Sequence, residues 1–158
     1  MSFELASGSH AVGEANYHMQ FTPAYRKSIF ADECVKILTR DYLLAAGKRY
    51  NITIAAISFG PDHCHLFVVN CKNHSPSQVA SLLKGFSSYM MRKRHAKLFC
   101  ETLAGAKFWT SGYFYRTVGA VNTVTARHYV EESQSKHWKT KEQKQRTLIE
   151  FNSKRSAL

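Results

Sequence analysis

Two histidines stand two positions apart in the segment PDHCHLFVV, which covers residues 61–69. In a β-strand, residues two apart project from the same face, so His63 and His65 lie side by side while Cys64 projects from the other face. Two imidazoles at this spacing can bind one divalent metal ion. The pair alone is also typical of an exposed strand face that binds nothing. The apolar run that follows predicts a central strand, which is a rigid support for metal ligands.

Tyr129 lies on a predicted helix and is the candidate nucleophile. By its spacing alone it is more typical of a tyrosine that packs against a core. A free phenol has a pKa of about 10, so it becomes an effective nucleophile at neutral pH only beside a metal or a basic group. His63, His65 and a bound metal would supply that positive field.

Two further segments combine cations with features that suit nucleic acid. Tyr25, Arg26 and a following lysine come directly after the first predicted strand, a pairing that suits base stacking and phosphate contact but is equally compatible with a solvated loop. Lys84 points away from the apolar stripe of its helix and is either a phosphate contact or an ordinary exposed lysine. Gly85 costs roughly 1 kcal/mol in a helix interior, which indicates close approach of another backbone.

The composition is that of one basic domain of 158 residues, with 22 Lys and Arg against 11 Asp and Glu and a net charge of +11. Such an excess favours a polyanionic partner, with nucleic acid first and an anionic membrane surface second. No apolar run approaches the roughly 20 residues of a membrane span, and the N-terminal segment lacks the pattern of a secretory signal.

The four cysteines, at positions 34, 64, 71 and 100, form no C-x-x-C motif. They are typical of reduced thiols in a cytoplasmic protein, and a DNA-acting protein there would be associated with the nucleoid. Neither a G-x-x-x-x-G-K loop nor a G-x-G-x-x-G motif occurs, so the sequence supports no nucleotide cofactor.

The elements that position these residues follow from hydrophobic periodicity. Alternating apolar residues predict a strand over 17–21, and a helical stripe predicts a helix over 32–46 with Gly47 as its C-cap. A run rich in β-branched residues, 51–59, predicts a strand, and a Gly-Pro-Asp turn joins it to a second predicted strand, 63–71, so that the two form a hairpin.

The second half of the chain predicts two more helices around a short β segment. Ser75 and Gln78 form a capping box before an apolar stripe that reaches Met90. Residues 109–118 are typical of one or two short strands. The last helix is predicted from an asparagine cap at 122 through Tyr129 to about residue 136.

This order predicts an α+β fold: a ferredoxin-like βαββαβ antiparallel sheet with helices on one face, plus a C-terminal helix that carries Tyr129. Residues 1–14 are predicted to be a polar arm, 15–136 the domain, and 137–158 a basic tail. The face of the sheet that the helices leave uncovered is free for chemistry or for nucleic acid.

Five segments taken together, in this order and covering about residues 15–136, resemble the single-tyrosine transposases of the HUH superfamily. These enzymes mobilise small bacterial and archaeal insertion sequences, and the REP-associated tyrosine transposases are close relatives. The segments are YHMQFTPAYRK (residues 17–27), DHCHL (62–66), KGFSS (84–88), the stretch from Trp109 to Gly119 that ends in TVG, and YVE (129–131).

The resemblance implies a metal-dependent DNA strand transferase. His63 and His65 would hold Mg²⁺ or Mn²⁺, and Tyr129 would attack the scissile phosphate of single-stranded DNA to form a 5′-phosphotyrosine and release a 3′-hydroxyl. A later 3′-hydroxyl would reseal a new junction without ATP. Family members act as homodimers on subterminal DNA hairpins, and the tyrosine helix serves either its own or the partner's histidine pair. The candidate DNA contacts are Tyr25, Arg26, Lys84 and Arg116.

One position departs from the family pattern, which places a glutamine four residues after the tyrosine as the third metal ligand. Ser133 occupies that position here, and Gln134 follows it. At 100° per residue, Ser133 lies about 40° around the helix from Tyr129, Glu132 about 60° the other way, and Gln134 about 140° away. Gln134 is therefore a ligand only if the helix bulges or ends there, and Glu132, Ser133 or a water are the alternatives.

Two rival functions remain open at this stage. One is a domesticated protein of the same fold that binds DNA hairpins without cutting them, which the departure at Ser133 keeps open. The other is an RNA-binding ferredoxin-like domain, whose sheet would present stacking aromatic rings. The strand from His63 presents histidines where such rings are expected.

Overall fold

The computed structural model describes residues 6–7, 12–104, 107–119, 124 and 128. Its strands and helices, in chain order, are β1 (Ala6–Ser7), β2 (Val12–Gly13), β3 (Asn16–Phe21), α1 (Glu33–Tyr50), β4 (Thr53–Gly60), β5 (His63–Val69), α2 (Pro76–His95), α3 (Cys100–Leu103) and β6 (Phe114–Val118), with short 3₁₀ turns at Ala24–Arg26, Ile29–Ala31 and Ala96–Leu98.

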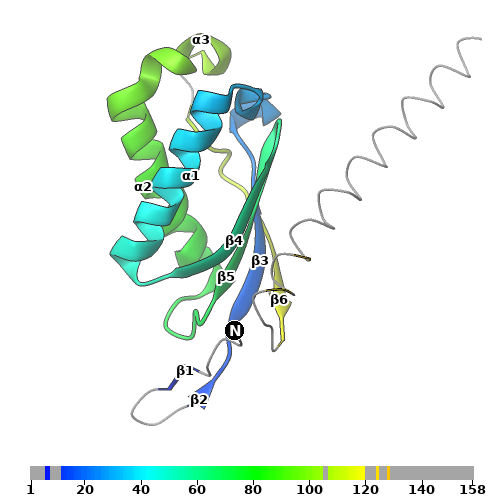
Figure 1. Cartoon of the computed structure of the whole chain (residues 1–158). Coiled ribbons are helices and arrows are strands. Elements are labelled where there is room, and N and C mark those ends of the chain that lie inside the picture. The colour runs from blue at the N-terminus through cyan, green and yellow to red at the C-terminus, as the bar shows by residue number, and fades with distance from the viewer. Residues whose placement is uncertain (1–5, 8–11, 105–106, 120–123, 125–127, 129–158) are drawn as a thin grey trace, which may run out of the picture.

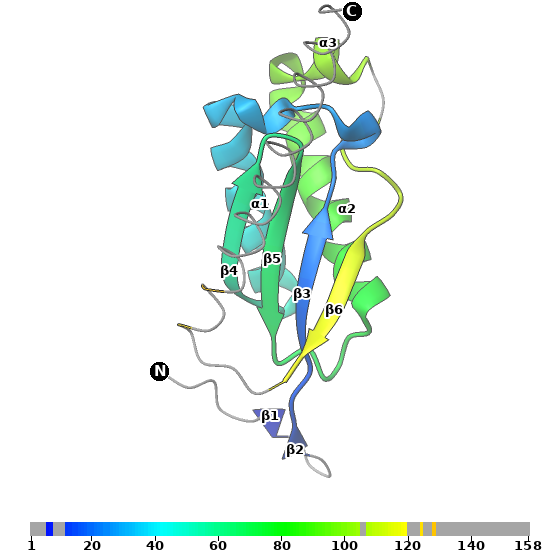
Figure 2. The same cartoon turned by 90° about the vertical axis from the view of Figure 1, so that its right-hand side faces the viewer.

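Four strands form one antiparallel sheet in the order β4-β5-β3-β6 (Figures 1 and 2). The first and third strands of the βαββαβ unit lie in the middle and the second and fourth at the edges, which is the ferredoxin-like order. The predicted fold class is therefore confirmed. β1 and β2 pair separately within the predicted N-terminal arm. The predicted Tyr129 helix and the boundary at residue 136 lie outside the described residues.

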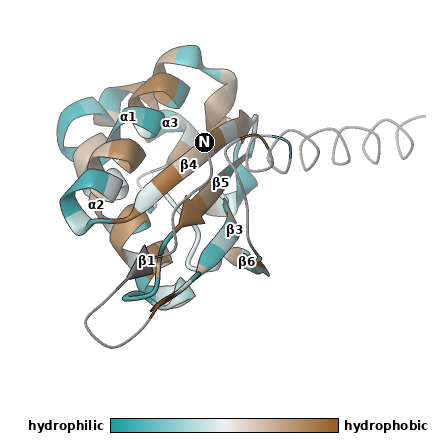
Figure 3. Ribbon diagram, turned by 60° about the horizontal axis from the view of Figure 1, so that its bottom comes forward, coloured by the Kyte–Doolittle hydropathy of each residue, from teal (hydrophilic) through white to brown (hydrophobic). Residues whose placement is uncertain are grey.

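Helices α1 and α2 cover one face of this sheet (Figure 1). The core between the helices and the sheet contains fully buried side chains from both layers, among them Met19, Phe21, Leu43, Leu66 and Leu83. All seven residues of β5 are buried, and Figure 3 shows the end of this strand in the brown of hydrophobic residues. The prediction of a central strand after the histidines is confirmed.

Helix α1 begins within one residue of the predicted start and ends at Tyr50, four residues after the predicted end at residue 46. Asp32 caps its start by accepting hydrogen bonds from the backbone N–H groups of Cys34 and Val35. The prediction of Gly47 as C-cap is wrong, because the helix continues to Tyr50 and the left-handed residue is Asn51, with φ of 55°. Gly47 instead lets the backbone of residue 52 pass close to the helix, since a Cβ at position 47 would lie 2.7 Å from the carbonyl oxygen of residue 52.

Helix α2 carries the predicted capping box. The Ser75 hydroxyl accepts from the Gln78 backbone N–H, and the Gln78 side chain accepts from the Ser75 backbone N–H. The short helix α3, which follows α2, was not predicted. The segment 109–118 supplies strand β6 and a single bridge between Pro23 and Trp109. Within the described ranges, no helix is long and apolar enough to cross a membrane.

Candidate functional site

Strand β5 places the two predicted histidines on one face. Cys64 and Leu66 point into the core under the helices, so His63 and His65 occupy the opposite face of the sheet. Their ring centroids lie 4.9 Å apart and their planes are nearly perpendicular, at 78°. Both side chains are buried, with 4% and 3% of their surface exposed. The predicted geometry of the pair is therefore confirmed.

His63 belongs to a chain of polar contacts that reaches the surface. Its Nδ1 lies 2.7 Å from Oδ1 of Asp62, and Oδ2 of Asp62 accepts from Nη2 of Arg26 at 3.3 Å. A carboxylate on one ring nitrogen is the usual partner of a metal-binding histidine, because it fixes the ring and its tautomer. With Nδ1 engaged in this way, Nε2 is the nitrogen that His63 can offer to a metal.

Gly60 makes room for the His63 ring. The two residues are register partners at the closed end of the β4–β5 hairpin. A Cβ on Gly60 would lie 2.4 Å from Cε1 and 2.8 Å from Nε2 of that ring, far inside any allowed contact. The sequence analysis assigned Gly60 only to a turn, and its contact with His63 was missed.

His18 is a second residue that the sequence analysis missed. Its Nε2 lies 3.1 Å from Nδ1 of His65, and the side chain is buried on the same sheet face. Burial and, to a smaller extent, the nearby Arg116 guanidinium lower the pKa of His18. Its alternation with Tyr17 and Met19 was a usable signal, but pairing it with His65 required the strand order.

The donor set fits a divalent metal at two positions. Two imidazoles that share one tetrahedral metal, at about 2.0–2.1 Å from each nitrogen, have ring centroids roughly 5 Å apart, close to the 4.9 Å between His63 and His65. Within the described ranges, no group of three or more His, Cys, Asp or Glu side chains is placed to hold a metal ion. The predicted third ligands, Glu132, Ser133 and Gln134, lie outside those ranges, as does Tyr129.

The turn that carries Tyr25 and Arg26 has an unusual backbone. Both residues adopt positive φ values, 56° and 52°, a left-handed conformation that costs an ordinary residue about 1–2 kcal/mol. This conformation leaves the Tyr25 side chain 77% exposed and brings Arg26 to Asp62. A strained turn that presents an exposed ring beside a candidate site is typical of a binding element.

Lys84 lies on the helix side of the sheet, away from the histidine pair. Its ammonium donates to the carbonyl oxygens of Ser111 at 3.3 Å and Gly112 at 2.8 Å, and it lies over the rings of Phe21 and Tyr113. Desolvation lowers the pKa of Lys84. The predicted Lys84 is thus held against the loop before β6, with one N–H remaining for a further acceptor.

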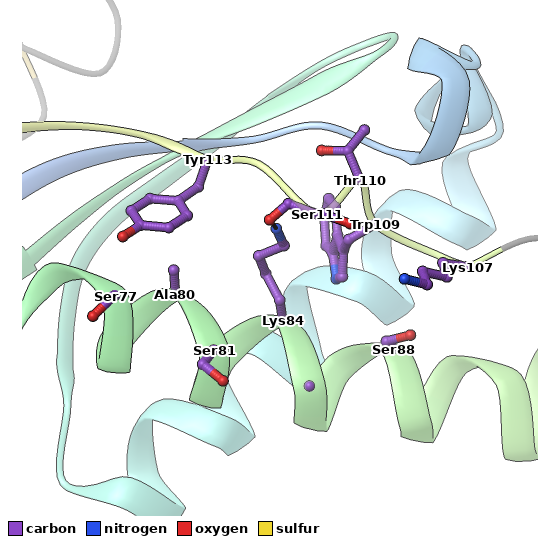
Figure 4. A pocket seen from close by; sticks show the side chains of 11 residues that line it. Ser77, Ala80, Ser81, Lys84, Ser88, Lys107, Trp109, Thr110, Ser111 and Tyr113 are labelled. Carbon is purple, nitrogen blue, oxygen red and sulfur yellow. Dashed lines mark hydrogen bonds between the residues drawn. The ribbon is translucent and has the colours of Figure 1, made fainter.

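Lys84 also lines a pocket of about 440 Å³ between α2 and that loop (Figure 4). The predicted close approach of a backbone to Gly85 is wrong for the part of the chain that the structure describes, where nothing lies within 4 Å of a Cβ placed there. The glycine instead leaves this wall of the pocket open. The lining holds two lysines, several hydroxyls and no acidic side chain: Ser77, Ala80, Ser81, Lys84, Gly85, Ser88, Lys107, Trp109, Thr110, Ser111 and Tyr113.

The structure therefore separates the predicted DNA contacts into two groups. Arg26 reaches the histidine pair through Asp62, and Arg116 is the register partner of His18 on β6. Tyr25 adjoins this group through the turn. Lys84 stands apart, in the pocket on the other side of the sheet.

Comparisons with known proteins identify the family to which the chain belongs. The family described as "Transposase IS200 like" matches residues 11–133. Transposases for insertion sequence element IS200 from Salmonella typhimurium and Salmonella typhi are each 28% identical over 123 residues, 78% of this chain and 79% of theirs.

Two solved structures are similar in fold. The crystal structure of a candidate transposase from Deinococcus radiodurans superposes with a TM-score of 0.64 at 23% identity, over 81% of this chain and 97% of that one. A REP-associated tyrosine transposase bound to a REP hairpin gives a TM-score of 0.48 at 14% identity, over 80% of this chain and 68% of that one. With the family match spanning most of its length, the chain belongs to the IS200-like transposases.

Proposed function

We propose that this transposase cuts and rejoins single-stranded DNA at the ends of an insertion sequence, with Tyr129 as nucleophile. The observation that carries the proposal is the pair His63 and His65 on the central strand, whose Nδ1 atoms lie against Asp62 and His18. That arrangement engages Nδ1 of each ring and leaves Nε2 as the nitrogen through which each histidine would bind a metal. It is the arrangement expected of metal ligands rather than of histidines that merely fill a sheet face.

Mg²⁺ or Mn²⁺ fits the proposed site, held by His63 and His65 and completed by Gln134, by Glu132 or Ser133, or by water. When bound, the metal would supply Lewis-acid polarisation of the scissile phosphate. Asp62 holds the proton of His63 on Nδ1, and the guanidinium of Arg26 keeps that carboxylate in place.

The proposed reaction conserves the energy of the phosphodiester bond. The Tyr129 oxygen attacks phosphorus, the bond from phosphorus to the 3′-oxygen breaks, and that oxygen leaves as a 3′-hydroxyl after taking up a proton. The product is a 5′-phosphotyrosine. A second 3′-hydroxyl then attacks the same phosphorus and displaces Tyr129, which reseals a new junction without ATP.

Two surfaces support contact with the DNA. Next to the histidines, the exposed ring of Tyr25 suits stacking on an unpaired base, and the cations Arg26 and Arg116 suit the phosphates around the cleavage point. On the helix side, Lys84 and Lys107 line the pocket of Figure 4. A hairpin substrate, with a paired stem and an unpaired flank, is long enough to use both.

A homodimer is the proposed assembly, and the edge of the sheet supports it. Among the described strands, β6 has a neighbour on one side only, β3. Phe114 and Tyr115 on this strand are 50% and 47% exposed. An uncovered edge strand with exposed aromatic side chains is a template for pairing with a second copy.

The direct test is a covalent adduct between the protein and its DNA. Wild-type protein incubated with labelled single-stranded hairpin DNA and Mg²⁺ or Mn²⁺ should give a shifted band on a denaturing gel. EDTA and the substitution Tyr129→Phe should each abolish the band. Tyr89→Phe, which removes the hydroxyl of an exposed tyrosine on α2, is the matched control and should keep it.

The outcomes separate the candidate functions. Tight binding of hairpin DNA without an adduct from any element end would refute cleavage and favour a protein that only binds hairpins. A clear preference for RNA over DNA of the same sequence would favour the RNA-binding alternative. An adduct that survives Tyr129→Phe would move the nucleophile to another residue.

A further inference from the structure

His18 lies on the histidine face of the sheet, one strand away from the proposed metal ligands. It is on β3, the neighbour of β5, and its register partner is Phe67, so it is diagonal to His65. We infer that His18 is a positioning residue, which holds His65 by its Nδ1 and so directs the Nε2 atom of His65 to the metal. This inference rests on the proposed metal site at His63 and His65.

The contact has the geometry of a defined hydrogen bond. The 3.1 Å between Nε2 of His18 and Nδ1 of His65 is an ordinary N–H to N distance. The ring centroids are 5.1 Å apart with planes tilted by 33°. Only 6% of His18 and 3% of His65 is exposed, so little water competes for the bond, and a bond in such surroundings is stronger.

Metal binding decides the direction of this bond. A histidine that binds a metal through Nε2 must have a lone pair on that atom, so its proton sits on Nδ1. His65 then donates from Nδ1, and Nε2 of His18 accepts. The opposite direction would leave Nδ1 of His65 without a proton and place the proton on Nε2, which blocks the metal.

The surroundings of His18 hold its ring in place. Arg116 is its register partner on β6. The ring of Phe114 meets His18 edge to face at a centroid distance of 6.4 Å and restricts its rotation. A His18 ring held in this place therefore does for His65 what Asp62 does for His63.

The test compares His18→Leu, which removes the acceptor, with His18→Gln, which keeps an acceptor oxygen near the same place. Mn²⁺ affinity is measured by titration of the full-length protein without DNA. His18→Leu should bind Mn²⁺ about 10–100-fold more weakly than wild type, the usual cost of losing a hydrogen-bond partner of a metal ligand. His18→Gln should stay within a few-fold of wild type.

The second measurement reports which ring nitrogen of His65 carries the proton. Nitrogen NMR of the metal-free protein distinguishes the two tautomers of His65, and wild type should show the proton on Nδ1. His18→Leu should shift His65 towards the tautomer protonated on Nε2. Thr39→Val is the control for general destabilisation, because it removes a different buried hydrogen bond, in α1, and should leave both readouts unchanged.

The outcomes keep the two proposals distinct. Wild-type Mn²⁺ affinity and an unchanged His65 tautomer in folded His18→Leu protein would overturn the role of His18 and leave the metal site standing. A wild-type protein that binds no Mn²⁺ would overturn the metal site, and with it the role of His18. Equal losses in His18→Gln and His18→Leu would show that the histidine acts by shape rather than as an acceptor, against the inference.

Discussion

Gly60 and His63 face each other at the closed end of the β4–β5 hairpin. A methyl group at position 60 would overlap the imidazole, whose Cε1 is 2.4 Å from the Cβ position. Because the ring is the movable partner, we expect Gly60→Ala to turn His63 away from Asp62 while the fold persists. Mn²⁺ affinity, measured by titration, should fall at least about tenfold.

The matched control for this prediction is Gly112→Ala. A Cβ at Gly112 meets none of the described residues within 4 Å, so this variant carries the same change of residue type without the clash. It should bind Mn²⁺ as wild type does. If Gly60→Ala keeps wild-type affinity and melts at the same temperature, the His63 ring is not fixed by this contact.

The cysteines give a prediction about pH. Cys34 and Cys100 are exposed, whereas Cys64 and Cys71 are buried. Burial raises the pKa of the Cys71 thiol from 9.0 to about 11, and since the thiolate is the reactive form, the buried pair should be inert at pH 8. A thiol reagent should label only the exposed pair in native protein and all four thiols in denaturant.

The raised pKa of Cys71 also predicts how the free energy of unfolding changes at alkaline pH. A folded pKa above the unfolded one means that the unfolded chain loses its proton first, so the stabilisation is complete below about pH 9 and is lost as the pH rises through about 11. Cys71→Ala should flatten this decline in the free energy of unfolding, measured by denaturant titration at pH 8 and 10.5. An equal decline in the variant would contradict the assignment.

At the scale of elements, we expect the turn after β3 to lower the stability of the fold while it favours the binding of single-stranded DNA. Tyr25 has a left-handed backbone conformation that costs about 1–2 kcal/mol. Because its ring is exposed, packing of that ring adds little stability to offset this cost. In Tyr25→Gly that cost disappears, offset in part by the freedom of glycine in the unfolded chain. The free energy of unfolding should not fall, while affinity for single-stranded DNA should fall about tenfold with the lost stacking.

Fluorescence anisotropy with a labelled oligonucleotide measures the binding half of this prediction. Tyr25→Phe is the control, because it keeps the ring and the backbone while removing the hydroxyl, and it should bind like wild type. Weaker binding by Tyr25→Phe would assign the contact to the hydroxyl instead of the stacked ring.

Most elements could be predicted because their signals are local. Alternation placed β3, the apolar run after the Gly-Pro-Asp turn placed β5, and the capping box placed the start of α2 to the residue. Gly47 was assigned wrongly because glycine has two uses, a positive φ and a close approach, and a sequence does not distinguish them. The short α3 carries no apolar stripe long enough to give a helical period.

The candidate site was predictable only within one strand. His63 and His65 share a face by the period of a strand, whatever the rest of the fold does. The contacts of His18 with His65 and of Arg26 with Asp62 join residues 47 and 36 positions apart. They depend on β3 lying beside β5 and on the left-handed turn, which no local pattern encodes.

At the scale of the whole molecule, the net charge of +11 predicts strong dependence of DNA binding on salt. Five cations near the two proposed surfaces are candidates for phosphate contacts: Arg26, Lys27, Lys84, Lys107 and Arg116. If each neutralises one phosphate, affinity for hairpin DNA should fall between about 100-fold and 500-fold from 50 to 200 mM salt.

Single substitutions then report individual contacts. Arg116→Ala should reduce the slope of log affinity against log salt by about one contact, or roughly 0.7–0.9. Lys48→Ala, which removes an exposed cation in the last turn of α1, should leave the slope unchanged. Equal slopes for all three proteins would mean that Arg116 makes no phosphate contact.

The contact between Gly60 and His63 also helps to identify inactive copies among related transposase sequences. Mobile elements leave decayed copies behind, and a decayed transposase can retain both histidines by chance. A side chain at the position of Gly60 removes the space that the first imidazole occupies. Among related chains, any residue other than glycine at this position would therefore mark a copy in which the proposed metal site is disrupted, even where both histidines are present in the sequence.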